Sequence, residues 1–381
     1  MAEVDLPAGS RHLTGSGARA RVPMVFWAAV ALGLALRIAV LVLSPDNPDT
    51  RSFEDTVRAG TTGLYDGVTR FNYSPLFAFV LYGLSFVAKA LGSPLRIALG
   101  AFLLAVDGAT TAVLLRRAGP SAAALFFLNP VSVFVSSFHL QFDGLAILFL
   151  VLAVAAGRER QFDERPGKVA GWLSLSLLVK HIAWFHPLLF LTRARTRRAA
   201  LLSLLPYAVF AASFLPFAAS WRGIRASVFG YRSLSESYGI RSFFPSAPER
   251  GLTVLFAAAL LVSVWLVRRL PLERAALLLF LVSLLFIPGI AEYYFVWPIA
   301  LGAFCGGGAG FFVYTIVVSL FLAGSPDGLH FQERFRHFPD WSGPWWACVF
   351  WLLWEIRRLA KAGGANPSLP SAAVSFPPAS R

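Results

Sequence analysis

An acidic stretch directly after the first long apolar segment holds the residues best suited to acid–base chemistry. It begins Pro48-Asp49-Thr50-Arg51 and continues to Asp55. A carboxylate held near the lipid–water boundary can act as a general base and take a proton from a bound hydroxyl group. Asp49 also stands where a short helix is expected to begin, and an aspartate there commonly caps the helix. Two interpretations of Asp49 follow, a general base and a helix cap.

Other charges on this short predicted helix are expected to pair with one another. Arg51 with Asp55, and Glu54 with Arg58, are four residues apart and therefore share a helix face.

A second polar group lies between two apolar segments, where His139, Gln141 and Asp143 alternate with apolar residues. In extended backbone all three side chains would point to one face. They suit sugar hydroxyls or a phosphate, although a hydrated turn would also use polar residues. One histidine and one aspartate do not make a metal site by themselves.

Lys180 and His181 lie inside an otherwise apolar segment. A lysine at the centre of a bilayer costs about 2.5–3.5 kcal/mol on insertion scales, so it needs a counter-charge. A bound phosphate would supply one. The alternative is a structural pair with Asp143 or with Asp107.

Glu292 follows a predicted helix break at Ile287-Pro288-Gly289 and precedes Tyr293-Tyr294. Tyrosines at such an edge commonly form an aromatic belt. The tryptophans at 341, 345, 346, 351 and 354 are likewise expected to form a belt and to face lipid. We take Glu292 as the functional candidate in this segment.

Composition assigns the chain to the membrane proteins. Hydrophobic residues make up 57% of the 381, charged residues 14%, and the mean hydropathy is +0.64. The apolar runs are long and do not alternate, so the predicted spans are helices and not barrel strands. The net charge of +14 resides mainly in short loops between spans, which indicates positive-inside bias and not nucleic-acid binding. The two cysteines, Cys305 and Cys348, form no disulfide framework or zinc pattern.

The predicted fold is an all-α polytopic bundle of about 11–12 transmembrane helices. Residues 1–22 are expected to be a cytoplasmic tail, 23–358 the membrane domain, and 359–381 a disordered cytoplasmic tail. The candidate spans are 23–43, 73–91, 95–115, 120–136, 143–157, 169–191, 199–219, 251–268, 275–290, 293–304, 309–323 and 345–358.

The segment 73–91 decides the topology. If it lies at the outer interface, within a long first outer loop over 44–94, the basic clusters at Arg116-Arg117 and 158–168 both become cytoplasmic, as the orientation rule prefers. The segment 169–191 must then enter and leave on the cytoplasmic side as a broken hairpin. We favour this topology over one in which 73–91 crosses. It gathers Asp49, His139, Asp143, Glu292 and the outer loop 220–250 on one face.

These motifs, in this order, resemble the GT-C superfamily of membrane glycosyltransferases, from about Met24 to Pro298. The nearest groups are the dolichyl-phosphate-glucose-dependent glucosyltransferases of N-glycan precursor assembly and the first mannosyltransferase of GPI-anchor synthesis. Asp49 stands where the superfamily places its catalytic aspartate. The motifs that carry the resemblance are Asn72-Tyr73-Ser74-Pro75-Leu76, His139-Leu140-Gln141-Phe142-Asp143 behind an Asn-Pro, Lys180-His181-Ile182 and Ala291-Glu292-Tyr293-Tyr294. The departures are Asp143 in place of an asparagine, Ala291 in place of a histidine, and Tyr293 in place of a basic residue.

The resemblance implies an inverting hexosyltransferase, for glucose or mannose, at the extracytoplasmic face of the membrane. The Ala/Arg-rich composition favours a bacterial-type inner membrane. The partners of the enzyme would be a polyprenyl-phosphate sugar donor, a glycan or lipid-linked acceptor, and membrane lipid, with no nucleic acid. Asp49 would be catalytic; Lys180, His181 and Arg51 would bind the donor phosphate. The sugar or acceptor would contact His139, Gln141, Asp143, Glu292 and Tyr73. No cofactor is assigned, and a divalent metal is compatible but not indicated.

Two other classes of protein stay open. A transporter or lipid-linked-sugar flippase could use Lys180 and Asp143 as a relay at the membrane midplane, although we find no internal repeat of the kind that transporters commonly show. A structural subunit without catalysis is disfavoured because polar residues occur at four separate membrane edges.

Overall fold

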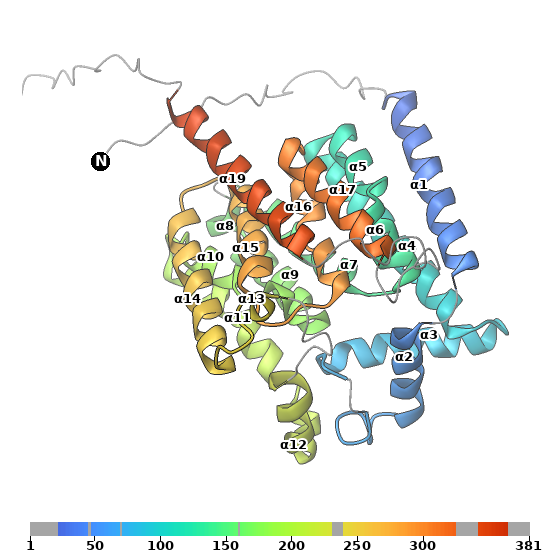
Figure 1. Cartoon of the computed structure of the whole chain (residues 1–381). Helices are drawn as coiled ribbons and strands as arrows, with labels where there is room; N and C mark the ends of the chain where they lie inside the picture. Colours follow the sequence, from blue (N-terminus) through green and yellow to red (C-terminus); the bar gives the residue numbers. More distant parts are fainter. Residues whose placement is uncertain are drawn as a thin grey trace, which may run out of the picture.

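The computed structural model describes residues 22–44, 47–68, 71–158, 161–230, 239–324 and 342–364, and these residues form helices and no strands (Figure 1). The longer helices are α1 (Met24–Leu43), α3 (Pro75–Ala90), α4 (Leu95–Ala118), α7 (Asp143–Gly157), α9 (Pro166–Val179), α11 (Arg197–Ala212), α14 (Glu249–Val267), α15 (Leu272–Phe286), α17 (Ala309–Gly324) and α19 (Ser342–Gly364). The shorter helices are α2 (Pro48–Ala59), α5 (Pro120–Phe127), α6 (Pro130–Val133), α8 (Gln161–Glu164), α10 (His186–Leu191), α12 (Trp221–Ile224), α13 (Ile240–Phe243) and α16 (Ile299–Phe304). Tighter or wider turns are η1 (Phe134–Phe138), η2 (His181–Ala183), η3 (Leu215–Ser220), η4 (Arg225–Phe229) and η5 (Glu292–Val296).

Three of these helices, α1, α4 and α14, are long and apolar enough to cross a membrane. The count rises to five if the bent pairs at 120–138 and 197–229 are each taken as one span. The chain is therefore an α-helical protein with three to five candidate spans among the described residues. Because several other segments form shorter apolar helices, the larger number of 11–12 spans stays a prediction.

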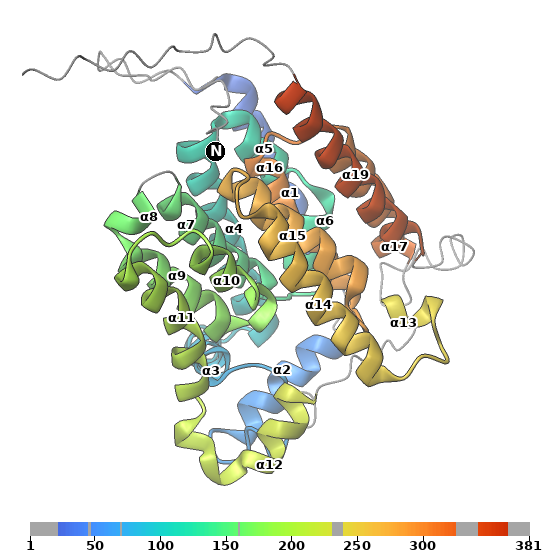
Figure 2. The same cartoon turned by 90° about the vertical axis from the view of Figure 1, so that its left-hand side faces the viewer.

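The two segments predicted as outer loops lie together at one end of the helix bundle. Ser220 Oγ donates a hydrogen bond to Asp66 Oδ2 at 2.5 Å, and Gly223 packs directly on the carbonyl of Tyr65. Figures 1 and 2 both place α2, α3 and α12 at this end, and α3 runs across the lower ends of α1 and α4 (Figure 1). This crosswise course is the one expected for an interfacial helix and not for a span. Residues 231–238, in the second of these loops, lie outside the described residues.

The basic loops meet at the opposite end. Arg158 forms an ion pair with Glu273 at 2.8 Å and donates to the carbonyl of Arg117. Asp163 Oδ1, just before α9, accepts a hydrogen bond from the backbone N–H of Arg195, just after α10. The chain from α9 to α10 therefore leaves this end and returns to it, as the predicted broken hairpin requires. Which end faces the cytoplasm stays a prediction.

Near the C-terminus, two predictions were wrong. Trp351 does not face lipid: it is buried, and its ring packs against Gly302 and Gly310, where α17 and α19 lie side by side (Figure 1). The boundary of the predicted tail at 359 also falls inside a helix, because α19 continues to Gly364. The predicted tails at 1–21 and 365–381, and the segment 325–341, lie outside the described residues.

The close contact between α17 and α19 leaves no room for a side chain at position 310. A Cβ atom there would lie 2.5 Å from Trp351 Cδ1 and 2.9 Å from its Cα, so the helix backbones must separate. We expect Gly310→Ala to lower the free energy of unfolding by about 1–3 kcal/mol. The matched control is Gly171→Ala in α9, where a Cβ meets nothing within 4 Å. Higher helix propensity should make that control neutral or stabilising in the same thermal melt of detergent-solubilised protein. Equal melting temperatures for the two variants would contradict this account.

Candidate functional site

The centre of the candidate site is a buried ion pair. Lys180 Nζ lies 2.6 Å from Asp143 Oδ2, and the two side chains are 3% and 0% exposed. Trp297 Nε1 donates to the other carboxylate oxygen of Asp143 at 2.7 Å. Both oxygens of Asp143 therefore have protein partners. The sequence left three counter-charges open for Lys180: a bound phosphate, Asp143 and Asp107. In the structure the counter-charge is Asp143.

Four aromatic rings surround the ammonium group of Lys180. The distances from Nζ to the ring centroids are 4.6 Å for Tyr293, 4.9 Å for Tyr294, 5.4 Å for Phe142 and 5.5 Å for Tyr73. The faces of such rings attract cations, and this attraction is strongest where water is excluded. The prediction of an interfacial belt for Tyr293 and Tyr294 was wrong, because both are buried and help to hold a charge inside the protein.

A break in the hairpin places Lys180 at this point. The helix α9 ends at Val179, and Lys180 itself has extended backbone (φ −158°, ψ 133°) before the turn η2. The break leaves backbone carbonyls at the end of α9 without intrahelical partners. Ser74 Oγ satisfies one of them by donating to the carbonyl of Leu178. The segment that carries Tyr73 is thus attached to the break that carries Lys180.

The position of Tyr73 is fixed further by the loop after α2. Tyr65 donates its hydroxyl to the carbonyl of Tyr73 at 3.0 Å. Burial raises the pKa of Tyr65, so this hydroxyl keeps its proton and remains a donor.

Asp49 is not the helix cap, so that interpretation was wrong. The cap of α2 is Asn47, which forms a reciprocal capping box with Thr50, and Asp49 is the second residue of the helix. Asn47 Nδ2 also donates to the carbonyl of Phe138 at 2.7 Å, which ties α2 to the segment before His139. This bond holds the start of α2, and with it Asp49, beside the segment that leads to His139.

The segment from His139 to Asp143 is not extended, contrary to our expectation. Residues 134–138 form a wide helical turn, Leu140 has a positive φ of 54°, and α7 begins at Asp143. The wide turn and the positive φ redirect the chain, so a simple alternation of faces does not apply. Wide helical turns are frequent at functional sites.

Two buried polar side chains in this segment lack hydrogen-bond partners among the described residues. For Gln141 both Oε1 and Nε2 are unpartnered, and for His139 the atom is Nε2. The ring of His139 lies 6.2 Å from that of Tyr293, which places it beside the aromatic cluster around Lys180. A buried polar group without a partner costs about 1–3 kcal/mol. Groups maintained at that cost point to a ligand that completes their hydrogen bonds.

The remaining predicted residues lie around this cluster. Glu292 is buried at the start of η5, next to Tyr293. His181 is half-buried, and its ring lies 6.3 Å from that of Phe210. Arg51 lies on the exposed side of α2 and is not part of the buried cluster.

The predicted pairing on α2 was half right. Arg58 pairs with Glu54 at 3.5 Å, as expected, and also with Asp55 at 3.2 Å. Asp55 was expected to pair with Arg51, but its ion pair in the structure is with Arg58, three positions further along the helix.

Two residues of the site were missed. Trp297 carries no signal in the sequence that distinguishes it from the belt tryptophans. Asn47 could have been found, because an asparagine followed by a proline is a typical start of a helix. Among the described residues, no three or more His, Cys, Asp or Glu side chains cluster as metal ligands.

The sequence matches no protein-family model and no curated protein. The resemblance to a membrane glycosyltransferase superfamily therefore depends on the residues of this site and on their order along the chain.

The buried pair predicts strong energetic coupling between Lys180 and Asp143. Asp143→Asn leaves a buried lysine without its counter-charge, and Lys180→Met leaves a buried carboxylate. We expect each to lower the free energy of unfolding by about 3–5 kcal/mol, and the double variant to lose much less than their sum. Arg58→Gln, which removes exposed pairs, should change it by less than about 1 kcal/mol. Additive losses in thermal melts would argue against the pair.

Replacing Gln141 should affect the stability of the protein and its affinity for substrate in different ways. Because its amide has no partner among the described residues, Gln141→Leu should leave the melting temperature unchanged or raise it. The same variant should bind substrate more weakly, by about tenfold or more for the loss of two hydrogen bonds. Ser203→Ala on α11, which removes a satisfied buried hydroxyl, is the control with the opposite expectation for stability. A lower melting temperature for Gln141→Leu would show that the amide is partnered.

Proposed function

We propose that this protein is an integral-membrane glycosyltransferase that transfers a hexose from a polyprenyl-phosphate donor to a glycan or lipid-linked acceptor at the extracytoplasmic face. One observation carries the proposal. Asn47 ties the start of α2, and with it the carboxylate of Asp49, to a segment in which the buried side chains of His139 and Gln141 have polar atoms without partners among the described residues.

In the proposed reaction, Asp49 takes the proton of an acceptor hydroxyl as its oxygen attacks the anomeric carbon of the donor hexose. The bond between that carbon and the phosphate oxygen breaks, and polyprenyl phosphate leaves. Attack from the side opposite the phosphate inverts the anomeric configuration. A positioned base of this kind contributes typically about 10²–10⁴-fold to the rate.

The departing phosphate gains negative charge, and Lys180 is the buried cation available to stabilise it. Electrostatic stabilisation is largest in a site without water, where the charged group is already in place. Asp143, Trp297 and the four rings hold Lys180 in such a state before substrate arrives. His181 and Arg51, at the periphery of the cluster, are further candidates for contact with the phosphate.

The sugar itself needs donors and acceptors of hydrogen bonds together with flat apolar surfaces. Gln141 offers both an amide donor and a carbonyl acceptor, and His139 offers a ring nitrogen. The rings of Tyr73 and Tyr293 provide flat surfaces for the C–H groups of a hexose. Glu292 is placed to accept from a further hydroxyl.

Asp49→Asn is the decisive substitution. It preserves the size of the side chain and removes the base, so sugar transfer should fall by about 10²–10⁴-fold while the melting temperature is retained. The matched control is Asp55→Asn, an exposed acid on the same helix, which should transfer at the rate of the natural protein. The assay uses purified protein in vesicles with polyprenyl-phosphate glucose, mannose or arabinose and candidate acceptors, with and without Mg²⁺. Normal transfer by Asp49→Asn would refute the assignment.

The buried pair at a helix break also favours the second candidate, a transporter or lipid-linked-sugar flippase, because such proteins place charged groups where helices are interrupted. The same vesicles distinguish the two. Movement of a labelled polyprenyl-phosphate sugar between leaflets, without transfer to any acceptor, would identify a flippase. Transfer without movement supports the enzyme.

A further inference from the structure

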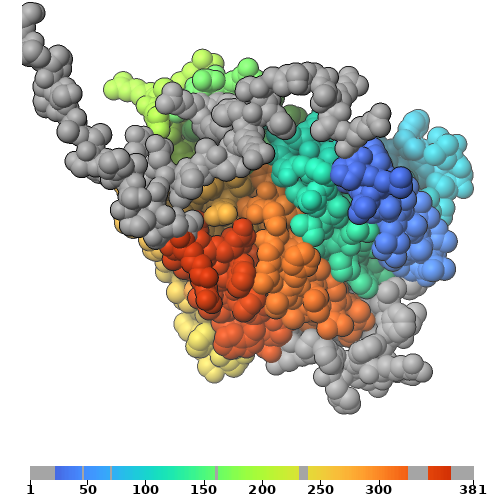
Figure 3. Space-filling model, turned by 90° about the horizontal axis from the view of Figure 1, so that it is seen from above, coloured from blue at the N-terminus to red at the C-terminus, as the bar shows by residue number. Residues whose placement is uncertain are grey.

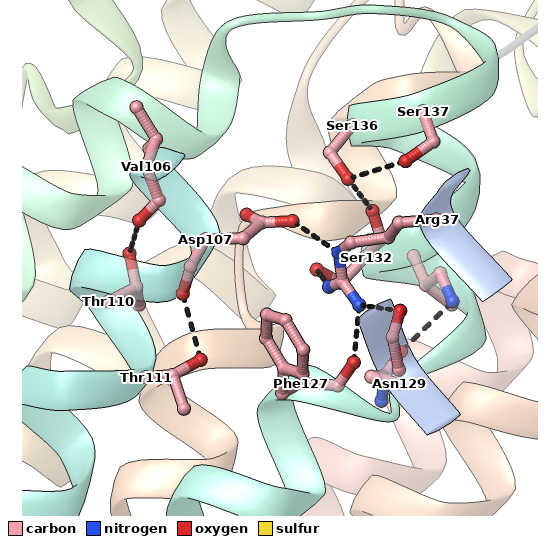
Figure 4. Close-up of polar contacts among 12 residues, drawn as sticks. Arg37, Val106, Asp107, Thr110, Thr111, Phe127, Asn129, Ser132, Ser136 and Ser137 are labelled. Atoms are coloured by element: carbon pink, nitrogen blue, oxygen red, sulfur yellow. Dashed lines mark hydrogen bonds and ion pairs between the residues drawn. The ribbon is translucent and has the colours of Figure 1, made fainter. Parts of the chain in front are cut away.

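A second buried ion pair lies deeper in the bundle and has no role in the proposed chemistry. Arg37 in α1 is 1% exposed, and its Nε lies 2.8 Å from Asp107 Oδ2 in α4 (Figure 4). Seen from above, α1 lies at the edge of the molecule beside α5 (Figure 3). Although most of α1 is exposed, this one charged side chain points inward.

The guanidinium group of Arg37 holds the start of the segment that leads to the site. Nη1 donates to the carbonyl of Phe127, the last residue of α5, and Nη2 donates to Ser132 Oγ in α6 at 2.9 Å (Figure 4). The helix ends here because Asn129 caps the next helix: its Oδ1 accepts the N–H of Val131, which an unbroken helix would donate to the carbonyl of Phe127. That carbonyl is therefore left without a helical partner. Gly33 allows the approach, since a Cβ there would lie 2.8 Å from that carbonyl oxygen.

Asp107 lies against the other end of the same segment. Its Oδ1 atom would be 3.6 Å from a Cβ at Gly144, the residue after Asp143. Between these two ends the chain carries His139 and Gln141, and the carbonyl of Phe138 holds Asn47 at the start of α2. The pair therefore bonds to one end of the segment 127–144 and lies close to the other.

We infer that Arg37 and Asp107 are positioning residues that fix the geometry of the segment 127–144 and, through Asn47, the placement of Asp49. This inference deepens the proposed function and rests on it for the meaning of the site. The contacts that it invokes exist without substrate, so they can be tested without a transfer assay.

The test is hydrogen–deuterium exchange of the full chain in lipid nanodiscs. Asp107→Asn removes the counter-charge, and Arg37→Lys keeps a charge but loses the two-pronged contact with Phe127 and Ser132. In both variants we expect exchange to be at least about tenfold faster over 134–144 and 47–59, and unchanged over α14 and α15. The control is Glu273→Gln, which breaks an Arg–carboxylate pair at the opposite end and should leave 134–144 and 47–59 unaltered.

Three results would overturn the inference. The first is an unchanged exchange rate over 134–144 in Asp107→Asn, and the second is an equal increase in exchange along the whole chain. The third is an exchange pattern of Arg37→Lys equal to that of the natural protein, which would mean that Arg37 only neutralises the charge of Asp107. Failure of the natural protein to transfer sugar would instead reject the proposed function, and the exchange result would still decide the positioning role.

Discussion

The burial of Lys180 beside Asp143 is the interaction on which the site depends. An ammonium group inside an apolar bundle is tolerated only with a counter-charge and with its remaining surface well packed. Asp143, Trp297 and four aromatic rings supply these conditions, and they come from segments far apart in the sequence. The groups that stabilise the charge of Lys180 therefore bring together the start of α7, the ends of α9 and η5, and the loop before α3.

The same rule governs the backbone. At each break in a helix the freed carbonyl groups need donors, and apolar surroundings supply none. Ser74 supplies one for Leu178, and Arg37 supplies one for Phe127. Both donors lie on other elements, so each break becomes a point of attachment. The breaks are where the chain departs from simple spans, and they are also where its polar side chains gather.

The sequence was sufficient to predict the helical membrane class and the broken hairpin, because hydropathy and the distribution of arginine are properties of whole segments. It was also sufficient to select Lys180, since a lysine in an apolar run is conspicuous. It could not predict that Leu140 has a positive φ, which depends on tertiary contacts. The cap at Asn47 was not predicted, because Asp49, two residues further on, is also of a type that commonly caps a helix. Arg37 was overlooked because a single arginine in a first span is commonly explained by orientation.

The short first arm of the hairpin of α9 and α10 limits how far across the bilayer Lys180 can lie. α9 contains 14 residues, so it is about 21 Å long, whereas the hydrocarbon core of a bilayer is about 30 Å thick. If α9 begins at one boundary, Lys180 stops about 9 Å short of the other. A head group that reaches Lys180 must then descend below the plane of its neighbours, or the bilayer must thin around the protein. Membrane thickness thereby becomes a determinant of which lipids can enter the site.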